Sequence, residues 1–224
     1  PVVYSFKADD AVDNNILNDY KIFVHMLELS DKKDYMVKNK TANFLTSEKL
    51  NYQYWTSRVE AGSGNLQMLR VMRMRALMEY PSKERYTKKL MASIAGRDNK
   101  VIVFANTQEQ ADKLSPYSYH SNNSRSEENL ELFKNGSINT LSTVHQLSEG
   151  VNIPNLKQGI IMHAYGNERK SAQRIGRLLR LNPDDTAVVH ILCYKNTMDE
   201  YWVKEALENF DKNKITYKTF NVQY

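Results

Sequence analysis

Residues 173–180 read QRIGRLLR. Its three arginines, Arg174, Arg177 and Arg180, are spaced three apart, so they fall on neighbouring turns if the segment is helical. Planar guanidinium groups clustered in this way suit an anion with several oxygens, above all a phosphate chain. A solvated basic helix face is the alternative, and the surrounding sequence decides between the two.

The composition is that of an ordinary globular protein. The 224 residues are 41% hydrophobic and 25% charged, and the net charge of +5 is compatible with nucleic acid without being evidence for it. Cys193 is the only cysteine, which excludes an internal disulfide and favours a reducing, cytoplasmic environment. Neither a transmembrane run, a signal-peptide pattern nor a metal-ligand spacing is present, so we expect no membrane and no metal site. Because the sequence opens on Pro1, we expect a longer protein whose front is missing here.

Strands and helices alternate from residue 100 onward. Apolar runs of strand length are typical of strands buried on both faces of a parallel sheet. They lie at residues 101–105, 138–143, 159–163 and 187–194, with a shorter strand expected at 117–120. Capping patterns that begin at Thr107, Ser124 and Thr197 predict helices after them. We therefore expect an α/β fold with a parallel sheet flanked by helices, in which ligands bind at the carboxyl ends of the strands.

Residues 30–98 have a different character, with few β-branched residues and many Lys, Arg, Glu, Met and Leu. Helical spacing predicts helices over residues 65–80 and 82–95, separated at Pro81. The excess of basic residues between 70 and 100 suits either contact with a polyanion or a plain solvated face. With the apolar run at 20–29 interpreted as a strand, we expect three parts: a connector and added strand (1–29), a helical insertion or accessory module (30–98) and the sheet domain (99–224).

Four motifs in a fixed order carry a resemblance to a known family. Residues 101–114 read VIVFANTQEQADKL and residues 119–136 read YHSNNSRSEENLELFKNG; a strand ending at Thr143 then leads to EGVNIP (149–154) and QRIGRLLR. This order resembles the second, C-terminal RecA-like motor domain of superfamily 2 helicases and translocases. The resemblance covers about residues 100–195 and, more loosely, the strand at 20–29.

The resemblance implies roles around a nucleotide. Arg177 and Arg180 match arginine fingers that reach the γ-phosphate of ATP bound on the first motor domain, and such a finger can be worth about 10³–10⁵ in rate. Gln173 and Arg174 match positions that touch the nucleotide or link the two domains. In the EGVNIP loop, Gly150 and Asn152 match residues that sense the nucleotide, although Asn152 could instead serve only as a turn residue.

The resemblance also implies a surface for nucleic acid. Thr143 matches a hydroxyl that contacts the phosphate backbone, a contact that positions the protein without reading sequence. Asn106 and Thr107, and His120 and Ser121, follow two strand ends and are weaker candidates for the same surface. A cap or turn role for Thr143 and a structural hydrogen bond for His120 are the alternatives.

Departures from the family pattern favour DNA over RNA. Asn152 stands where aspartate is usual, Ser121 follows the histidine in place of glycine, and Leu179 replaces the last glycine of the arginine motif. These changes point away from the DEAD-box RNA helicases and look more like DNA-directed branches.

The chain has no phosphate-binding G-x-x-x-x-G-K-[ST] loop and no D-E-x-[DHQ] box for Mg²⁺. We therefore expect ATP and Mg²⁺ to be held mainly by an N-terminal RecA-like domain of the same polypeptide, and this fragment to be inactive alone. Three alternatives stay open: a stand-alone nucleic-acid-binding module, an RNA helicase domain, and an α/β domain that binds a nucleotide sugar.

Overall fold

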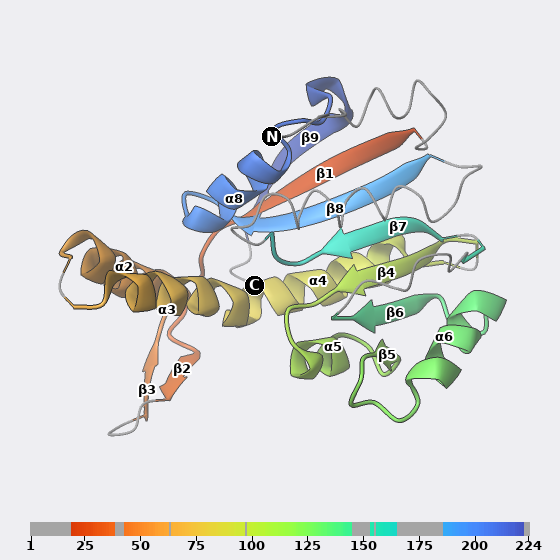
Figure 1. The fold of residues 1–224 in the computed structure, drawn as a ribbon, viewed down its shortest axis with the longest axis horizontal. Helices are drawn as coiled ribbons and strands as arrows, with labels where there is room; N and C mark the ends of the chain where they lie inside the picture. The colour runs from red at the N-terminus through yellow and green to blue at the C-terminus, as the bar shows by residue number, and fades with distance from the viewer. Residues whose placement is uncertain are drawn as a thin grey trace, which may run out of the picture.

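The computed structural model describes residues 19–38, 43–62, 64–96, 98–144, 153–154, 156–164 and 186–221. Seven strands form one sheet in the order β5-β6-β4-β7-β8-β1-β9, and every neighbouring pair in it is parallel. Their bounds are β1 Tyr20–Leu27, β4 Lys100–Phe104, β5 Ser118–Tyr119, β6 Thr140–Thr143, β7 Leu156–Ile161, β8 Ala187–Tyr194 and β9 Ile215–Phe220. The predicted parallel sheet flanked by helices is confirmed (Figure 1).

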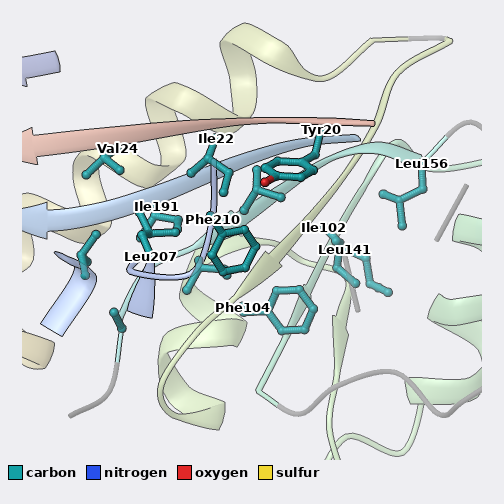
Figure 2. Packing of buried hydrophobic residues seen from close by; sticks show 14 of the residues in the cluster. Tyr20, Ile22, Val24, Ile102, Phe104, Leu141, Leu156, Ile191, Leu207 and Phe210 are labelled. Carbon is teal, nitrogen blue, oxygen red and sulfur yellow. The ribbon is translucent and has the colours of Figure 1, made fainter. Parts of the chain in front are cut away.

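Helices cover both faces of this sheet, because side chains alternate along each strand and every buried strand has two faces to cover. The first face packs against α6 (Ser126–Asn135) and α8 (Met198–Ala206), which contribute Phe133 and Val203. The side chains of this cluster include Ile22 from β1 and both Ile102 and Phe104 from β4 (Figure 2). The opposite face packs against α3 (Leu66–Glu79), α4 (Pro81–Ile94) and α5 (Gln108–Leu114).

The strand predicted near the start of the chain lies inside the sheet rather than at its edge. β1 pairs with β8 on one side, where Ile22 lies opposite Val189, and with β9 on the other, where Ile22 lies opposite Ile215. β9 was not predicted from the sequence. Its residues, ITYKTF, are mostly exposed, so the strand lacks the continuous apolar run that marked the others.

The segment expected to be mostly helical contains a β-hairpin as well. Strands β2 (Tyr35–Lys38) and β3 (Asn43–Thr46) pair antiparallel before α2 (Glu48–Glu60) begins. This hairpin was not predicted, because Tyr, Val, Phe and Thr in two short runs favour strand but are too few to give a clear period. Figure 1 shows this hairpin, α2 and part of α3 projecting beyond the carboxyl ends of the strands.

The helix α4 lies against the sheet, although its sequence groups it with the helical segment 30–98. Its Met91, and Tyr80 just before it, share a buried cluster with Val101, Ile160 and Leu192 from three strands. In Figure 1, α4 passes behind the strands. The end of the helical segment is thus part of the core of the sheet domain.

The predicted helix starts are only partly reproduced. Thr107 and Thr197 cap α5 and α8, and their Oγ1 atoms accept hydrogen bonds from Gln110 N and Asp199 N at 3.1 Å each. The cap expected at Ser124 was wrong: α6 begins at Ser126 and has no side-chain cap. Arg125 occupies the cap position instead, and Ser126 Oγ accepts a hydrogen bond from the backbone N–H of His120 and donates one to its backbone O, which holds the preceding turn in place.

Replacing Gly136 by alanine should destabilise the protein. Gly136 ends α6 with φ of +84°, a left-handed conformation that disfavours a Cβ atom. We expect a loss of about 1 kcal/mol in the free energy of unfolding, measured by urea denaturation. Gly96→Ala is the matched control, because Gly96 has no positive φ and a Cβ there would meet nothing within 4 Å. Equal stability of the two variants would contradict the strain argument.

Candidate nucleotide and nucleic-acid interface

The carboxyl ends of the parallel strands meet at one edge of the sheet, where ligands bind in open α/β folds. β4 and β6 are in register with Phe104 opposite Thr143, and β6 and β5 with Thr143 opposite Tyr119. The residues that follow these strands are therefore neighbours at the edge. The structure thus brings together the predicted pairs Asn106–Thr107 and His120–Ser121 with Thr143.

Direct hydrogen bonds connect two of these loops. Gln108 Nε2 donates to Ser121 Oγ at 3.2 Å, and Asn122 Nδ2 donates to Gln108 Oε1 at 2.7 Å. Thr107 and Ser121 are both exposed, whereas Asn106 is half-buried and its backbone N–H donates to Gln110 Oε1 at 2.9 Å. Two exposed hydroxyls on adjacent loops form a small polar surface that can donate hydrogen bonds to an anion.

His120 is buried and has a structural partner. Its Nε2 lies 2.9 Å from Asp112 Oδ1, and its backbone is held by Ser126. Hydrogen bonds from Ser118 and then from His120 lower the pKa of the Asp112 carboxyl. Nδ1 of His120 has no hydrogen-bond partner in the part of the chain that the structure describes. His120 therefore makes the structural hydrogen bond that was the alternative interpretation of the sequence. A role of His120 toward nucleic acid stays a prediction.

Thr143 is fully buried, and its hydroxyl donates to the backbone O of Tyr119 at 3.0 Å. A phosphate accepts hydrogen bonds, so contact with it would require this hydroxyl to turn away from Tyr119. The role of Thr143 toward a phosphate stays a prediction.

The residues expected around the nucleotide lie outside the described residues. This holds for the predicted arginine fingers, Arg177 and Arg180, and for four further residues, which are Gly150, Asn152, Gln173 and Arg174. Their roles rest on the sequence resemblance.

A buried polar cluster behind this edge was not predicted. Lys83 forms an ion pair with Asp199, and Lys83 Nζ also lies 3.4 Å from His163 Nδ1, at the end of β7. One feature of the sequence could have indicated this cluster. Lys83 falls on the helical stripe of α4 that otherwise buries Thr87 and Met91, a position where a lysine is unexpected.

Metal-binding clusters and membrane-spanning helices are both absent from the described residues. No group of three or more His, Cys, Asp or Glu side chains among them is placed to hold a metal ion. No described helix has the length and apolar character needed to span a bilayer.

Residues 82–182 match the family described as helicase conserved C-terminal domain. The structure agrees with that match, since T4 UvsW aligns over 91% of this chain and 42% of its own at a TM-score of 0.57 and 15% identity. Residues 82–182 thus match a helicase C-terminal domain, and the chain has the fold of the C-terminal RecA-like domains of superfamily 2 helicases. This helicase domain accounts for the order of motifs seen in the sequence.

Two curated relatives resemble the helicase domain in sequence. The DNA 3'-5' translocase XPB2 of Sulfurisphaera tokodaii is 28% identical over 109 residues, which are 46% of this chain and 25% of the relative. The ATP-dependent RNA helicase DBP2 of Candida albicans is 22% identical over 156 residues, which are 63% of this chain and 28% of the relative. The chain thus spans roughly a quarter of the length of these relatives.

Proposed function

We propose that this chain is the C-terminal motor domain of an ATP-dependent DNA helicase or translocase. The observation that carries the proposal is the helicase C-terminal domain at residues 82–182, whose parallel strands end in polar loops at one edge. In this proposal an N-terminal RecA-like domain of the same polypeptide holds ATP and Mg²⁺, and this fragment hydrolyses no ATP alone. The protein acts inside the cell, where nucleic acid is present.

The arginine motif supplies charge to the site of phosphoryl transfer. Arg177 and Arg180 donate to the γ-phosphate, where negative charge spreads over several oxygens during transfer. Gln173, Arg174, Gly150 and Asn152 contact the nucleotide or couple it to the other domain. The spacing of the arginines and the order of the motifs support these assignments.

The sheet edge and the helical segment supply contacts to the nucleic-acid backbone. Thr107 and Ser121 present exposed hydroxyls, and Asn106, His120 and Thr143 lie beside them. Three arginines of α3 add positive charge and have no ion-pair partner within the described residues; these are Arg70, Arg73 and Arg75. Neutral and charged donors of this kind contact phosphates without reading bases.

DNA is favoured over RNA as the substrate. The S. tokodaii relative is named a DNA translocase and has the higher identity, whereas the C. albicans relative is named an RNA helicase. The departures at Ser121, Asn152 and Leu179 from the DEAD-box pattern support the same choice. An RNA helicase domain, or a binding module without ATPase activity, is the alternative.

Binding to nucleic acid should weaken steeply as salt rises. We expect the logarithm of the association constant of the full-length protein to fall linearly with the logarithm of salt concentration, because phosphate contacts release counterions. Fluorescence anisotropy with labelled single- and double-stranded DNA and RNA of matched sequence measures this, and DNA should bind more tightly than RNA. Tighter binding of RNA would favour the alternative helicase class, and the absence of binding to all four would contradict the proposed function.

A further inference from the structure

An ion pair is sealed inside the molecule directly behind the sheet edge. The side chains of Lys83 and Asp199 are 1% and 3% exposed, and Lys83 Nζ contacts Asp199 Oδ2. Lys83 also lies 4.7 Å above the ring of Tyr194. It is in the first turn of α4, where the positive end of the helix dipole disfavours a cation. Burial and the dipole therefore both oppose a lysine here, and only its partners offset them.

From Lys83 a continuous line of hydrogen bonds leads to the turn after β4. Lys83 has only donors, so Nδ1 of His163 at 3.4 Å is an acceptor, and the proton of this ring lies on Nε2. That Nε2 lies 3.2 Å from Gln110 Oε1, which also accepts the backbone N–H of Asn106 at 2.9 Å. Gln110 Nε2 donates to the backbone O of Met78 at 3.1 Å, which fixes the amide orientation. The position of Asn106 is thereby linked to the ion pair.

A second line of hydrogen bonds leads from Lys83 to α2. The backbone N–H of Lys83 donates to the Tyr194 hydroxyl at 3.1 Å, and Tyr194 and Ser82 share a hydrogen bond of 2.7 Å. Ser82 Oγ donates to Glu48 Oε2 at 2.6 Å, so the Tyr194 hydroxyl is the donor to Ser82. Glu48 also accepts the backbone N–H of Ser30, which follows β1. The cluster therefore joins α2, α4, α8 and the ends of β1, β7 and β8.

A contribution to stability does not by itself explain why charged residues occupy this buried position. A buried ion pair replaced by apolar residues of similar volume is often neutral or stabilising, because both charges must be desolvated in the folded state. We propose that Lys83, together with Asp199 and His163, positions the turn after β4 so that Asn106 and Thr107 contact the nucleic-acid backbone. The inference rests on the proposed function and adds positioning residues to it.

The double variant Lys83→Met/Asp199→Asn separates positioning from stability. Lys83→Met alone leaves a buried carboxylate unpaired and should lower Tm markedly, whereas the double variant removes both charges and should recover most of that loss. The carboxamide oxygen introduced by Asp199→Asn would still be able to accept from Tyr194 N, which donates to Asp199 at 3.0 Å in the native chain. Despite its recovered Tm, the full-length double variant should bind labelled single-stranded DNA about tenfold more weakly, since hydrogen bonds to phosphate are lost.

The salt dependence of binding distinguishes the loss of neutral contacts at this turn from the loss of a contact between a charged side chain and phosphate. Asn106 and Thr107 are neutral, so a mispositioned turn should lower affinity and leave the slope against salt unchanged. Lys88→Met is the matched control, because it removes the same charge from the same helix at an exposed position paired with Glu84. If Lys88 contacted phosphate, its loss would lower the slope by about one; otherwise it should leave binding unchanged.

A double-mutant cycle tests whether the effect passes through the turn. Thr107→Ala should weaken binding by the native protein and have little further effect in the Lys83→Met/Asp199→Asn background. Gln110→Ala cuts the line between His163 and Asn106 while leaving the ion pair intact, and should reproduce the loss of affinity even if the double variant fails to fold.

Native affinity in Gln110→Ala, native affinity in a folded double variant, or an additive effect of Thr107→Ala would each overturn the inference. A native protein that binds no nucleic acid would instead reject the proposed function itself, so the two failures are distinguishable.

Discussion

Alanine at Arg177 or at Arg180 should abolish nucleic-acid-stimulated ATP hydrolysis by the full-length protein while leaving the fold intact. In the proposed function, each guanidinium stabilises charge that develops on the γ-phosphate, and removal of such a finger lowers the rate by about 10³–10⁵. A loss of this size falls in kcat rather than in KM, because the contact strengthens in the transition state. Steady-state ATPase assays with saturating DNA measure kcat and KM, and the circular dichroism spectrum checks that the fold is intact.

Arg125→Ala is the control for the arginine variants. Arg125 precedes α6, is exposed, and pairs with Glu128 through Nε and an Nη atom at 2.9 Å each. An exposed pair of this kind contributes little to stability, so Arg125→Ala should retain native turnover and native fold. Turnover like that of the native protein in both Arg177→Ala and Arg180→Ala would exclude the finger role.

Acid should destabilise the protein through two buried histidines. Tyr86, His25, His190 and Gln158 form one line of hydrogen bonds of 2.7, 2.9 and 2.7 Å. With Gln158 Oε1 as the acceptor at its end, the line is satisfied when both rings are neutral and carry the proton on Nε2. Burial lowers the pKa of each histidine to about 4, with smaller contributions from Lys218 at His25 and from His25 at His190.

The sign of the pH dependence follows from these lowered values. Unfolded histidines bind protons below a pKa of about 6.5, while the folded rings stay neutral until about pH 4, so stability is full above pH 6.5 and is lost as pH falls toward 4. At pH 5 the loss is about 2 kcal/mol for each histidine relative to neutral pH. Urea denaturation at pH 7 and pH 5 measures it.

A variant without the two histidines separates their effect from that of other groups. His25→Phe/His190→Leu should have a smaller difference in unfolding free energy between pH 7 and pH 5 than the native protein, whatever its stability at pH 7. Phe220 and Phe23 stack on His25 and His190 at ring-centroid distances of 5.2 and 5.6 Å, so apolar replacements have suitable neighbours. The same pH difference in the variant and the native protein would show that other groups are responsible.

The strands that were predicted from the sequence are mainly those that are buried on both faces of the sheet. The run VIVF that ends β4 is apolar without interruption, because helices cover both sides of it, and this pattern is hard to mistake. In β9 only Ile215 is buried, and the hairpin strands β2 and β3 have four residues each. Short or exposed strands are stabilised by pairing with strands distant in sequence, so the local pattern of apolar residues does not predict them.

The candidate site was predictable where topology alone determines it. Parallel strands deliver their carboxyl ends to one edge, so the approach of Asn106–Thr107 to His120–Ser121 followed from the strand assignment. Burial of Lys83 could not be anticipated in the same way, because lysine is rarely buried and its partners Asp199 and His163 are remote in sequence. The residues around the nucleotide were predicted from the order of the motifs, and their roles stay a prediction.

A structure of the full-length protein bound to DNA, Mg²⁺ and the transition-state mimic ADP–aluminium fluoride tests the central claim most directly. Our account predicts that the guanidinium groups of Arg177 and Arg180 contact the aluminium fluoride at the boundary between the two RecA-like domains, with the turn at Asn106 and Thr107 facing the DNA backbone. Guanidinium groups directed away from the nucleotide, or paired with internal carboxylates, would contradict it.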